Sequence, residues 1–180
     1  IDLNCLLLRV EEILAAAFAD DPARAAEYQA AADQRRHAIQ KRLCDENRGY
    51  FFDVSIYDGR IIPLTTAAGM FALYAGAATQ DQAERAAAYM ETHLLRKGGL
   101  LTTDINSGQQ WDSPNGWAPL QWIAIKGLRR YGLTELAETL RQRWLASCDI
   151  VFRQSGKFVE KYNMLDPENP SSGGEYALQD

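Results

Sequence analysis

The feature that most constrains the fold is a repeated order of segments: two stretches with helical periodicity, then a short extended link. Apolar residues recur every three or four positions in the helical stretches, and proline, glycine or a capping residue separates one stretch from the next. This order occurs three times along the 180 residues. Helix pairs connected in this way pack into a curved array of antiparallel helices. We therefore predict an all-α fold with short strand-like links.

The boundaries of these segments follow from local signals. We expect Asp2 and Thr79 to cap the first and fourth helices and Pro22 to lie near the start of the second. The predicted helices cover residues 3–17, 22–43, 67–77, 80–95, 120–131 and 134–152, and the extended links cover 50–54, 100–103 and 157–162. The first helix carries an apolar stripe at helical spacing, formed by Leu3, Leu6, Leu7, Val10, Ile13, Leu14 and Ala17.

Three helix pairs make an incomplete array. The last residues, 163–180, have no helical period and are rich in proline, serine and glycine, and they add no closing element. We expect residues 1–180 to be the C-terminal part of one larger α/α-toroid domain.

Charge and cysteine usage exclude several classes of function. The net charge of −5 and the lack of a Lys/Arg cluster argue against a nucleic-acid partner, and no apolar run reaches the length of a membrane span. Three separated cysteines and two separated histidines give neither metal-ligand spacing nor a histidine-based triad. We therefore predict no metal and no cofactor.

The segment from Gln109 to Pro119 concentrates two tryptophans, two prolines, a glycine and an acid between predicted helices. Pro114 excludes a helix just before it, so the segment is a loop that presents an indole, a carboxylate and amides together. A sugar site needs such groups, but a buried turn whose tryptophans fill the core fits equally well. Asp112 suits a role in bracing the loop better than one in catalysis.

Two glutamates in later links are candidates for chemistry. In a strand, Phe158, Glu160 and Tyr162 would face the same way and place a carboxylate between two rings, a setting suited to general acid or base work. The alternative is a solvent-facing Glu160 paired with Lys157 or Lys161. Glu175 follows paired glycines, which allow close approach to a ligand, although a solvated loop fits that segment too.

Residues 110–119 read Gln-Trp-Asp-Ser-Pro-Asn-Gly-Trp-Ala-Pro. This segment resembles the signature Gln-Trp-Asp-x-Pro-x-Gly-Trp-x-Pro of the trehalase family of glycoside hydrolases, without a departure. The resemblance extends over essentially the whole chain, through Asp2-Leu3-Asn4, Pro119-Leu120-Gln121-Trp122, Val159-Glu160-Lys161-Tyr162 and Gly173-Gly174-Glu175-Tyr176 with Leu178-Gln179-Asp180.

The resemblance implies a toroid of six helix pairs, of which about half is present here, and hydrolysis of α,α-trehalose to two glucoses with inversion. It assigns the general base to Glu160 and sugar contacts to Glu175 and Trp111. The family's general acid and its substrate-binding arginines would lie before the first residue. We therefore expect residues 1–180 alone to be inactive, with the rest of the domain and the disaccharide as partners.

Two other functions remain open from the sequence. One is a non-catalytic α/α scaffold or carbohydrate-binding remnant that keeps the loops without the reaction. The other is a related toroid acting on a different glucoside, which the signature loop makes less favourable. A Trp-Asp segment encoded upstream in the complete gene would favour the trehalase function over a non-catalytic scaffold.

Overall fold

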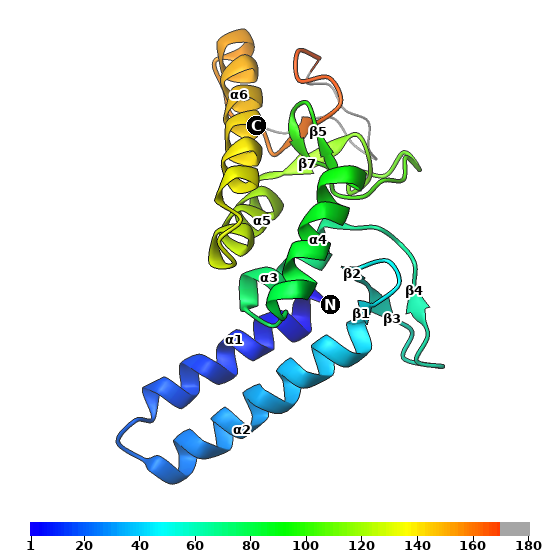
Figure 1. The fold of residues 1–180 in the computed structure, drawn as a ribbon. Helices are drawn as coiled ribbons and strands as arrows, with labels where there is room; N and C mark the ends of the chain where they lie inside the picture. Colours follow the sequence, from blue (N-terminus) through cyan, green and yellow to red (C-terminus); the bar gives the residue numbers. More distant parts are fainter. Residues whose placement is uncertain (170–180) are drawn as a thin grey trace.

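The computed structural model describes residues 1–169, which are mostly helical with short two-stranded ladders (Figure 1). The helices are α1 (Asp2–Ala17), α2 (Pro22–Ala38), α3 (Phe71–Ala75), α4 (Gln80–His93), α5 (Ala118–Arg130) and α6 (Thr134–Ser155). The antiparallel ladders pair β1 (Cys44–Asp45) with β2 (Tyr50–Phe51), β3 (Asp53–Val54) with β4 (Ile61–Ile62), β5 (Leu95–Arg96) with β6 (Gly99–Leu100), and β7 (Asn115–Trp117) with β8 (Lys161–Asn163). The predicted helical class is confirmed.

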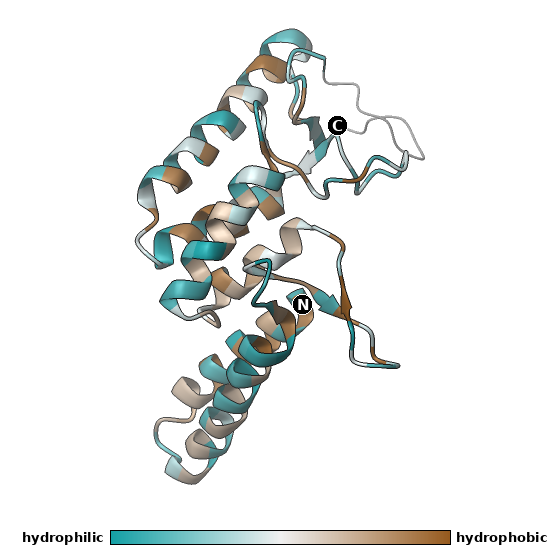
Figure 2. Ribbon diagram, turned by 45° about the vertical axis from the view of Figure 1, so that its right-hand side comes forward, coloured by the Kyte–Doolittle hydropathy of each residue, from teal (hydrophilic) through white to brown (hydrophobic). Residues whose placement is uncertain are grey.

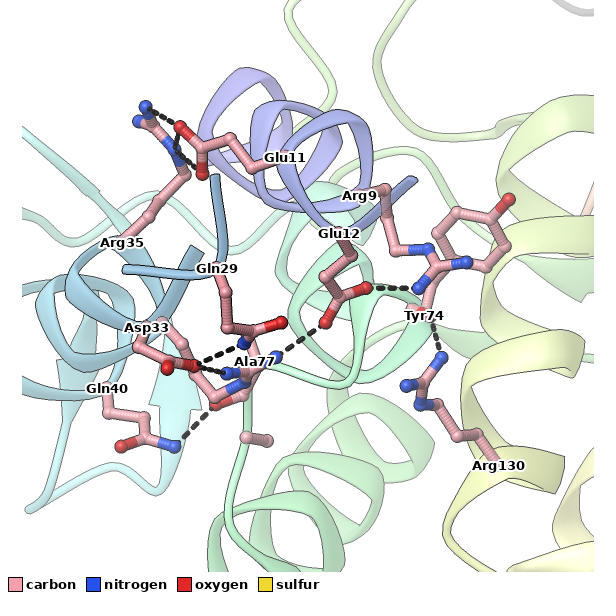
Figure 3. A network of polar contacts seen from close by, with 12 residues as sticks. Arg9, Glu11, Glu12, Gln29, Asp33, Arg35, Gln40, Tyr74, Ala77 and Arg130 are labelled. Carbon is pink, nitrogen blue, oxygen red and sulfur yellow. Dashed lines mark hydrogen bonds and ion pairs between the residues drawn. The ribbon is translucent and has the colours of Figure 1, made fainter. Parts of the chain in front are cut away.

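The first two helices form a long antiparallel hairpin that extends away from the other helices (Figure 1). The Asp21 carboxylate accepts a hydrogen bond from Arg24 N, and Pro22 occupies the first turn of α2 as predicted. Charged pairs hold the two helices together, with the Arg35 guanidinium bound to both carboxylate oxygens of Glu11 (Figure 3). Bidentate geometry of this kind fixes the register of one helix against the other.

The prediction that Asp2 caps α1 is wrong. The helix begins at Asp2 itself, Ile1 is the capping position, and the Asp2 carboxylate accepts only from Leu3 N. The apolar stripe on α1 also stays largely exposed, and α1 buries Cys5 and Leu8 instead. An exposed apolar stripe of this kind is typical of a surface that another protein segment covers.

The middle helices differ from the predicted pair. Residues 67–77 form a 3₁₀ turn followed by the short helix α3, which ends at Gly76 in the left-handed conformation. As expected for an apolar segment, α3 is buried, and it packs between α1 and α5. Helix α4 contacts β2, β5 and the 3₁₀ turn rather than forming a regular hairpin with α3.

The last two helices pack against each other and carry the candidate site at one end. Apolar and polar residues alternate along α6, as in an amphipathic helix (Figure 2). The predicted end of α6 is short by about one turn, because the helix continues to Ser155 and stops at Gly156 with φ of +72°. The following strand also begins later in the sequence than the predicted link at residue 157, because β8 starts at Lys161.

The start of α4 provides a test of local stability. Thr79 and Gln82 form a capping box, in which Thr79 Oγ1 accepts from Gln82 N at 3.2 Å and Gln82 Oε1 accepts from Thr79 N at 3.1 Å. We expect Thr79→Ala to lower the free energy of unfolding by about 1 kcal/mol, because a backbone N–H loses its acceptor. Chemical denaturation measures this loss. Thr79→Ser keeps the oxygen and should match the wild type; a similar loss in both variants would contradict the capping role.

Candidate active site

The signature loop and the segment carrying Glu160 lie side by side because β7 pairs with β8. Trp117 lies opposite Lys161 and Gly116 opposite Tyr162, and Met164 N donates to Pro114 O at 2.8 Å. Figure 1 shows β7 at the start of α5, next to the chain that follows α6. The pairing thus joins two stretches that are about 45 residues apart in the sequence.

Close packing at β7 requires glycine at position 116. A Cβ atom there would lie 2.5 Å from Met164 Sδ and 2.6 Å from the Leu100 carbonyl oxygen. The backbone oxygen cannot move aside without breaking the fold, so no larger residue fits. Backbone packing therefore explains the glycine of the signature.

The two tryptophans of the loop have different roles. Their rings stack in parallel, with centroids 4.0 Å apart and planes 5° from each other. Trp117 is buried and its Nε1 donates to Gln110 O at 3.2 Å, whereas Trp111 leaves 47% of its surface exposed. The core-filling interpretation is thus right for Trp117, and Trp111 is left as a supported, partly open aromatic surface.

Asp112 braces the loop, as the sequence predicts. Its Oδ1 accepts from Thr103 Oγ1 at 3.2 Å, and its Oδ2 accepts from the backbone N–H and the hydroxyl of Ser107. With both oxygens engaged in tying residues 103–112 together, this carboxylate has a structural function.

Glu160 does not lie in a strand, so the predicted arrangement of its side chain between Phe158 and Tyr162 is wrong. Phe158 is exposed and stacks on Phe152 with centroids 5.0 Å apart, while Tyr162 is buried against Trp144. The reason is the late start of β8: residues 157–160 form a turn after α6, and the alternation of a strand does not apply to them.

The environment of Glu160 is nevertheless unusual. Its side chain is 24% exposed, and Oε1 lies 3.6 Å from Nζ of Lys161, whose side chain is completely buried. Among residues 1–169, Glu160 Oε1 is a buried oxygen that accepts no hydrogen bond. The Lys161 ammonium also lies 5.9 Å from the centre of the Trp117 ring, within the range of a cation–π contact. Trp111, Trp117, Lys161 and Glu160 therefore form one continuous series of contacts, which we call the indole–lysine–glutamate series.

The alternative that paired Glu160 with Lys157 or Lys161 is right about the ion pair with Lys161 and wrong about the solvent-facing position, because the lysine is buried. That burial could not be predicted, since nothing in the spacing of Lys161 distinguishes a buried lysine from a surface one. No role was predicted for Gln121 either. Gln121 is fully buried, and its amide both donates to Leu100 O at 2.7 Å and accepts from Leu100 N at 2.8 Å. This double hydrogen bond fixes the first turn of α5, and hence Trp117, against β6. The position of Gln121 just after the signature segment was the one feature of the sequence that could have indicated its importance.

Glu175, the third predicted site residue, lies outside the described residues. Cavities elsewhere on the described part of the chain are distinct from the series. One groove of about 570 Å³ runs between α5 and α6, with Trp122 and Trp144 in its walls. Within residues 1–169, no cluster of three or more histidine, cysteine or acidic side chains is arranged for a metal ion, and no helix is long and apolar enough to cross a bilayer.

Comparison with known proteins identifies the family. The model described as Trehalase matches residues 1–180, the whole chain. The chain belongs to the trehalase family. A periplasmic trehalase of Salmonella paratyphi C (strain RKS4594) is 43% identical over all of this chain, and a putative periplasmic trehalase of Salmonella typhi has the same identity. In both cases the chain spans 32% of the relative, about a third of its length.

Solved structures of this family and of another hydrolase share the fold. The neutral trehalase Nth1 from Saccharomyces cerevisiae superposes with a TM-score of 0.84 at 32% identity, over 92% of this chain and 34% of that one. A mannosylglycerate hydrolase from Thermus thermophilus, solved in complex with glucose, gives a TM-score of 0.75 at 26% identity, over 95% of this chain and 43% of that one. The chain thus shares its fold with about a third of the yeast protein and about two fifths of the Thermus thermophilus protein.

Proposed function

We propose that residues 1–180 are the C-terminal part of one α/α-toroid catalytic domain, and that the complete enzyme hydrolyses α,α-trehalose to two glucoses with inversion. Family membership and the names of the curated relatives support the substrate. One observation supports the role of this part of the chain: Glu160 presents a buried carboxylate oxygen with no hydrogen-bond donor among the described residues. Such an atom needs an explanation, and a position for accepting a proton from water provides one.

In this mechanism Glu160 is the general base. Its carboxylate takes a proton from a water molecule while the water oxygen bonds to the anomeric carbon of one glucose. The bond between that carbon and the glycosidic oxygen breaks, and a carboxylic acid from outside residues 1–180 protonates the departing oxygen. Attack from the opposite face releases one β-glucose and one α-glucose. An inverting pair of carboxyl groups stands about 6.5–9.5 Å apart to leave room for the water.

The sugar contacts are assigned to the neighbouring aromatic surface and the following loop. Trp111 is backed by Trp117 and partly open to solvent, so its free surface can stack against the apolar face of a glucose ring. Glu175, which lies outside the described residues, is proposed to bind a sugar hydroxyl. Residues 1–180 by themselves lack the acid and are expected to show no turnover.

The main alternative is a helical scaffold or carbohydrate-binding remnant without the reaction. Asp112 stabilises the segment that carries Trp111. This bracing favours carbohydrate binding both in a trehalase and in a non-catalytic remnant, so it does not separate the two. Activity on another glucoside was a further possibility, and the likeness to a mannosylglycerate hydrolase shows that this fold also occurs in an enzyme named for a different glycoside. The trehalase signature and the higher identity to trehalases favour trehalose. Turnover of trehalose by the complete protein separates these functions.

The role of Glu160 predicts the effect of one substitution in the complete enzyme. Glu160→Gln should lower kcat by about 10³-fold, because a general base contributes about 10²–10⁴-fold. Binding of a trehalose-like inhibitor should change by less than about threefold, since the amide keeps the size of the carboxyl group. Steady-state kinetics and calorimetry measure the two quantities. Glu168→Gln, at an exposed glutamate paired with Lys97, is the matched control. A Glu160→Gln enzyme with normal kcat would refute the role.

A second substitution tests the stacking surface. Trp111→Ala should weaken inhibitor binding and raise KM by about tenfold, which corresponds to about 1.4 kcal/mol of lost contact with the ring. Trp111→Phe retains an aromatic face and should recover most of the binding. A fall in kcat for Trp111→Ala with unchanged KM would be incompatible with a role in sugar stacking.

A further inference from the structure

Lys161 is the most unusual charged residue in the described chain. Its side chain has no exposed surface, although lysine is among the residue types that are almost never fully buried without a partner. Removing an ammonium group from water is costly, and the cost is offset only where an opposite charge or an aromatic face replaces the solvent. Both are present: the Glu160 carboxylate at 3.6 Å and the Trp117 ring at 5.9 Å. The burial of this ammonium group beside Glu160 and Trp117 therefore indicates a specific role for Lys161.

The backbone around Glu160 is held on both sides. After it, Lys161 is paired across the β7–β8 ladder with Trp117, so the lysine stem has a fixed starting point beside the indole. Before it, Val159 N donates to the hydroxyl of Tyr162 at 3.2 Å, which closes the turn. Tyr162 itself is buried against Trp144 of α6, with ring centroids 4.8 Å apart. These contacts fix the backbone on either side of Glu160. They do not determine the direction in which its side chain points.

The length of the ion pair shows how Lys161 can set that direction. At 3.6 Å, the separation of Nζ and Oε1 is longer than a hydrogen bond, and Oε1 remains free of a donor within the described part of the chain. The ammonium therefore attracts the carboxylate by charge without occupying the lone pairs that a water molecule would use. A closer, hydrogen-bonded lysine would compete with the water.

Three other titratable side chains of this region, Cys148, Tyr162 and Asp112, carry no positive charge. Burial raises the pKa of the Cys148 thiol and of the Tyr162 hydroxyl, so both are neutral near neutral pH. The Asp112 carboxylate on the adjoining loop is hydrogen-bonded to Thr103 and Ser107. Within residues 1–169, Lys161 is the cation that forms an ion pair with Glu160.

We infer that Lys161 is a positioning residue: its buried ammonium, fixed against the Trp117 indole, holds the Glu160 carboxylate in the direction needed to accept a proton from the attacking water. The inference rests on the proposed role of Glu160 as the base. It also gives the buried tryptophan of the signature a function, because Trp117 links the sugar-facing Trp111 to the base through Lys161. Misdirecting a reacting group by about 1 Å can cost about 10²-fold in rate.

The experiment compares Lys161→Met, Lys161→Arg and Lys97→Met in the complete enzyme. Methionine fills the same volume without the charge, and we expect kcat to fall about 10–100-fold while KM and inhibitor affinity change by less than about threefold. Arginine keeps the charge in a different geometry and should give an intermediate kcat. Lys97 is an exposed lysine paired with Glu168, so its substitution should leave both parameters unchanged.

Coupling to Glu160 separates a positioning role from a general structural one. If Lys161 acts through Glu160, the double variant Glu160→Gln/Lys161→Met should have the same residual rate as Glu160→Gln alone. Additive losses would overturn the inference, as would a Lys161→Met enzyme with wild-type kcat or one that loses substrate affinity instead. If Lys161→Met does not fold, Lys161→Arg tests the inference in its place. A lowered kcat at unchanged KM supports the positioning role of Lys161, and a wild-type kcat opposes it.

Normal turnover by Glu160→Gln would instead refute the proposed role of Glu160 as the base.

Discussion

The antiparallel pairing of β7 with β8 is the interaction on which the candidate site depends. It brings the loop before α5 against the turn after α6, and it places Trp117 directly opposite Lys161. The pairing is possible only because Gly116 lets the backbone approach Met164 and the Leu100 carbonyl. Helix α5 is fixed to the same place by the two hydrogen bonds of Gln121 to Leu100. Two short strands thus determine which side chains can meet at this end of the helical array.

Around that pairing, two carboxylates differ in their hydrogen bonding. Asp112 has both oxygens engaged within its own loop, whereas Glu160 keeps a buried oxygen without a hydrogen bond in the described residues. The difference follows from the backbone: Asp112 faces the hydroxyls and N–H groups of a tight loop, and Glu160 faces a buried lysine across a longer ion pair. The difference in surrounding donors is the reason why we propose a bracing role for Asp112 and a catalytic role for Glu160.

Much of the helical framework could be predicted because its signals are local. Pro22 and Thr79 each act within one turn of the helix that they begin, and the observed starts of α2 and α4 follow them. The start of β8 could not be predicted, since it depends on a partner strand about 45 residues earlier. The burial of Lys161 and the packing of α3 between α1 and α5 likewise arise from contacts between distant segments. Trp111 was predicted from the signature, and Glu160 and Glu175 were predicted from later segments of the resemblance. The arrangement of Trp111 and Glu160 depends on tertiary contacts, which the sequence does not show.

A structure of the complete enzyme with a trehalose-like inhibitor is the most direct test of the account. It should contain a water molecule within about 3 Å of Glu160 Oε1, below the anomeric carbon and with Lys161 still buried behind the carboxylate. The acid that faces Glu160 across the sugar should stand about 6.5–9.5 Å away. A Glu160 side chain turned away from the sugar, with another carboxylate holding the water, would contradict it.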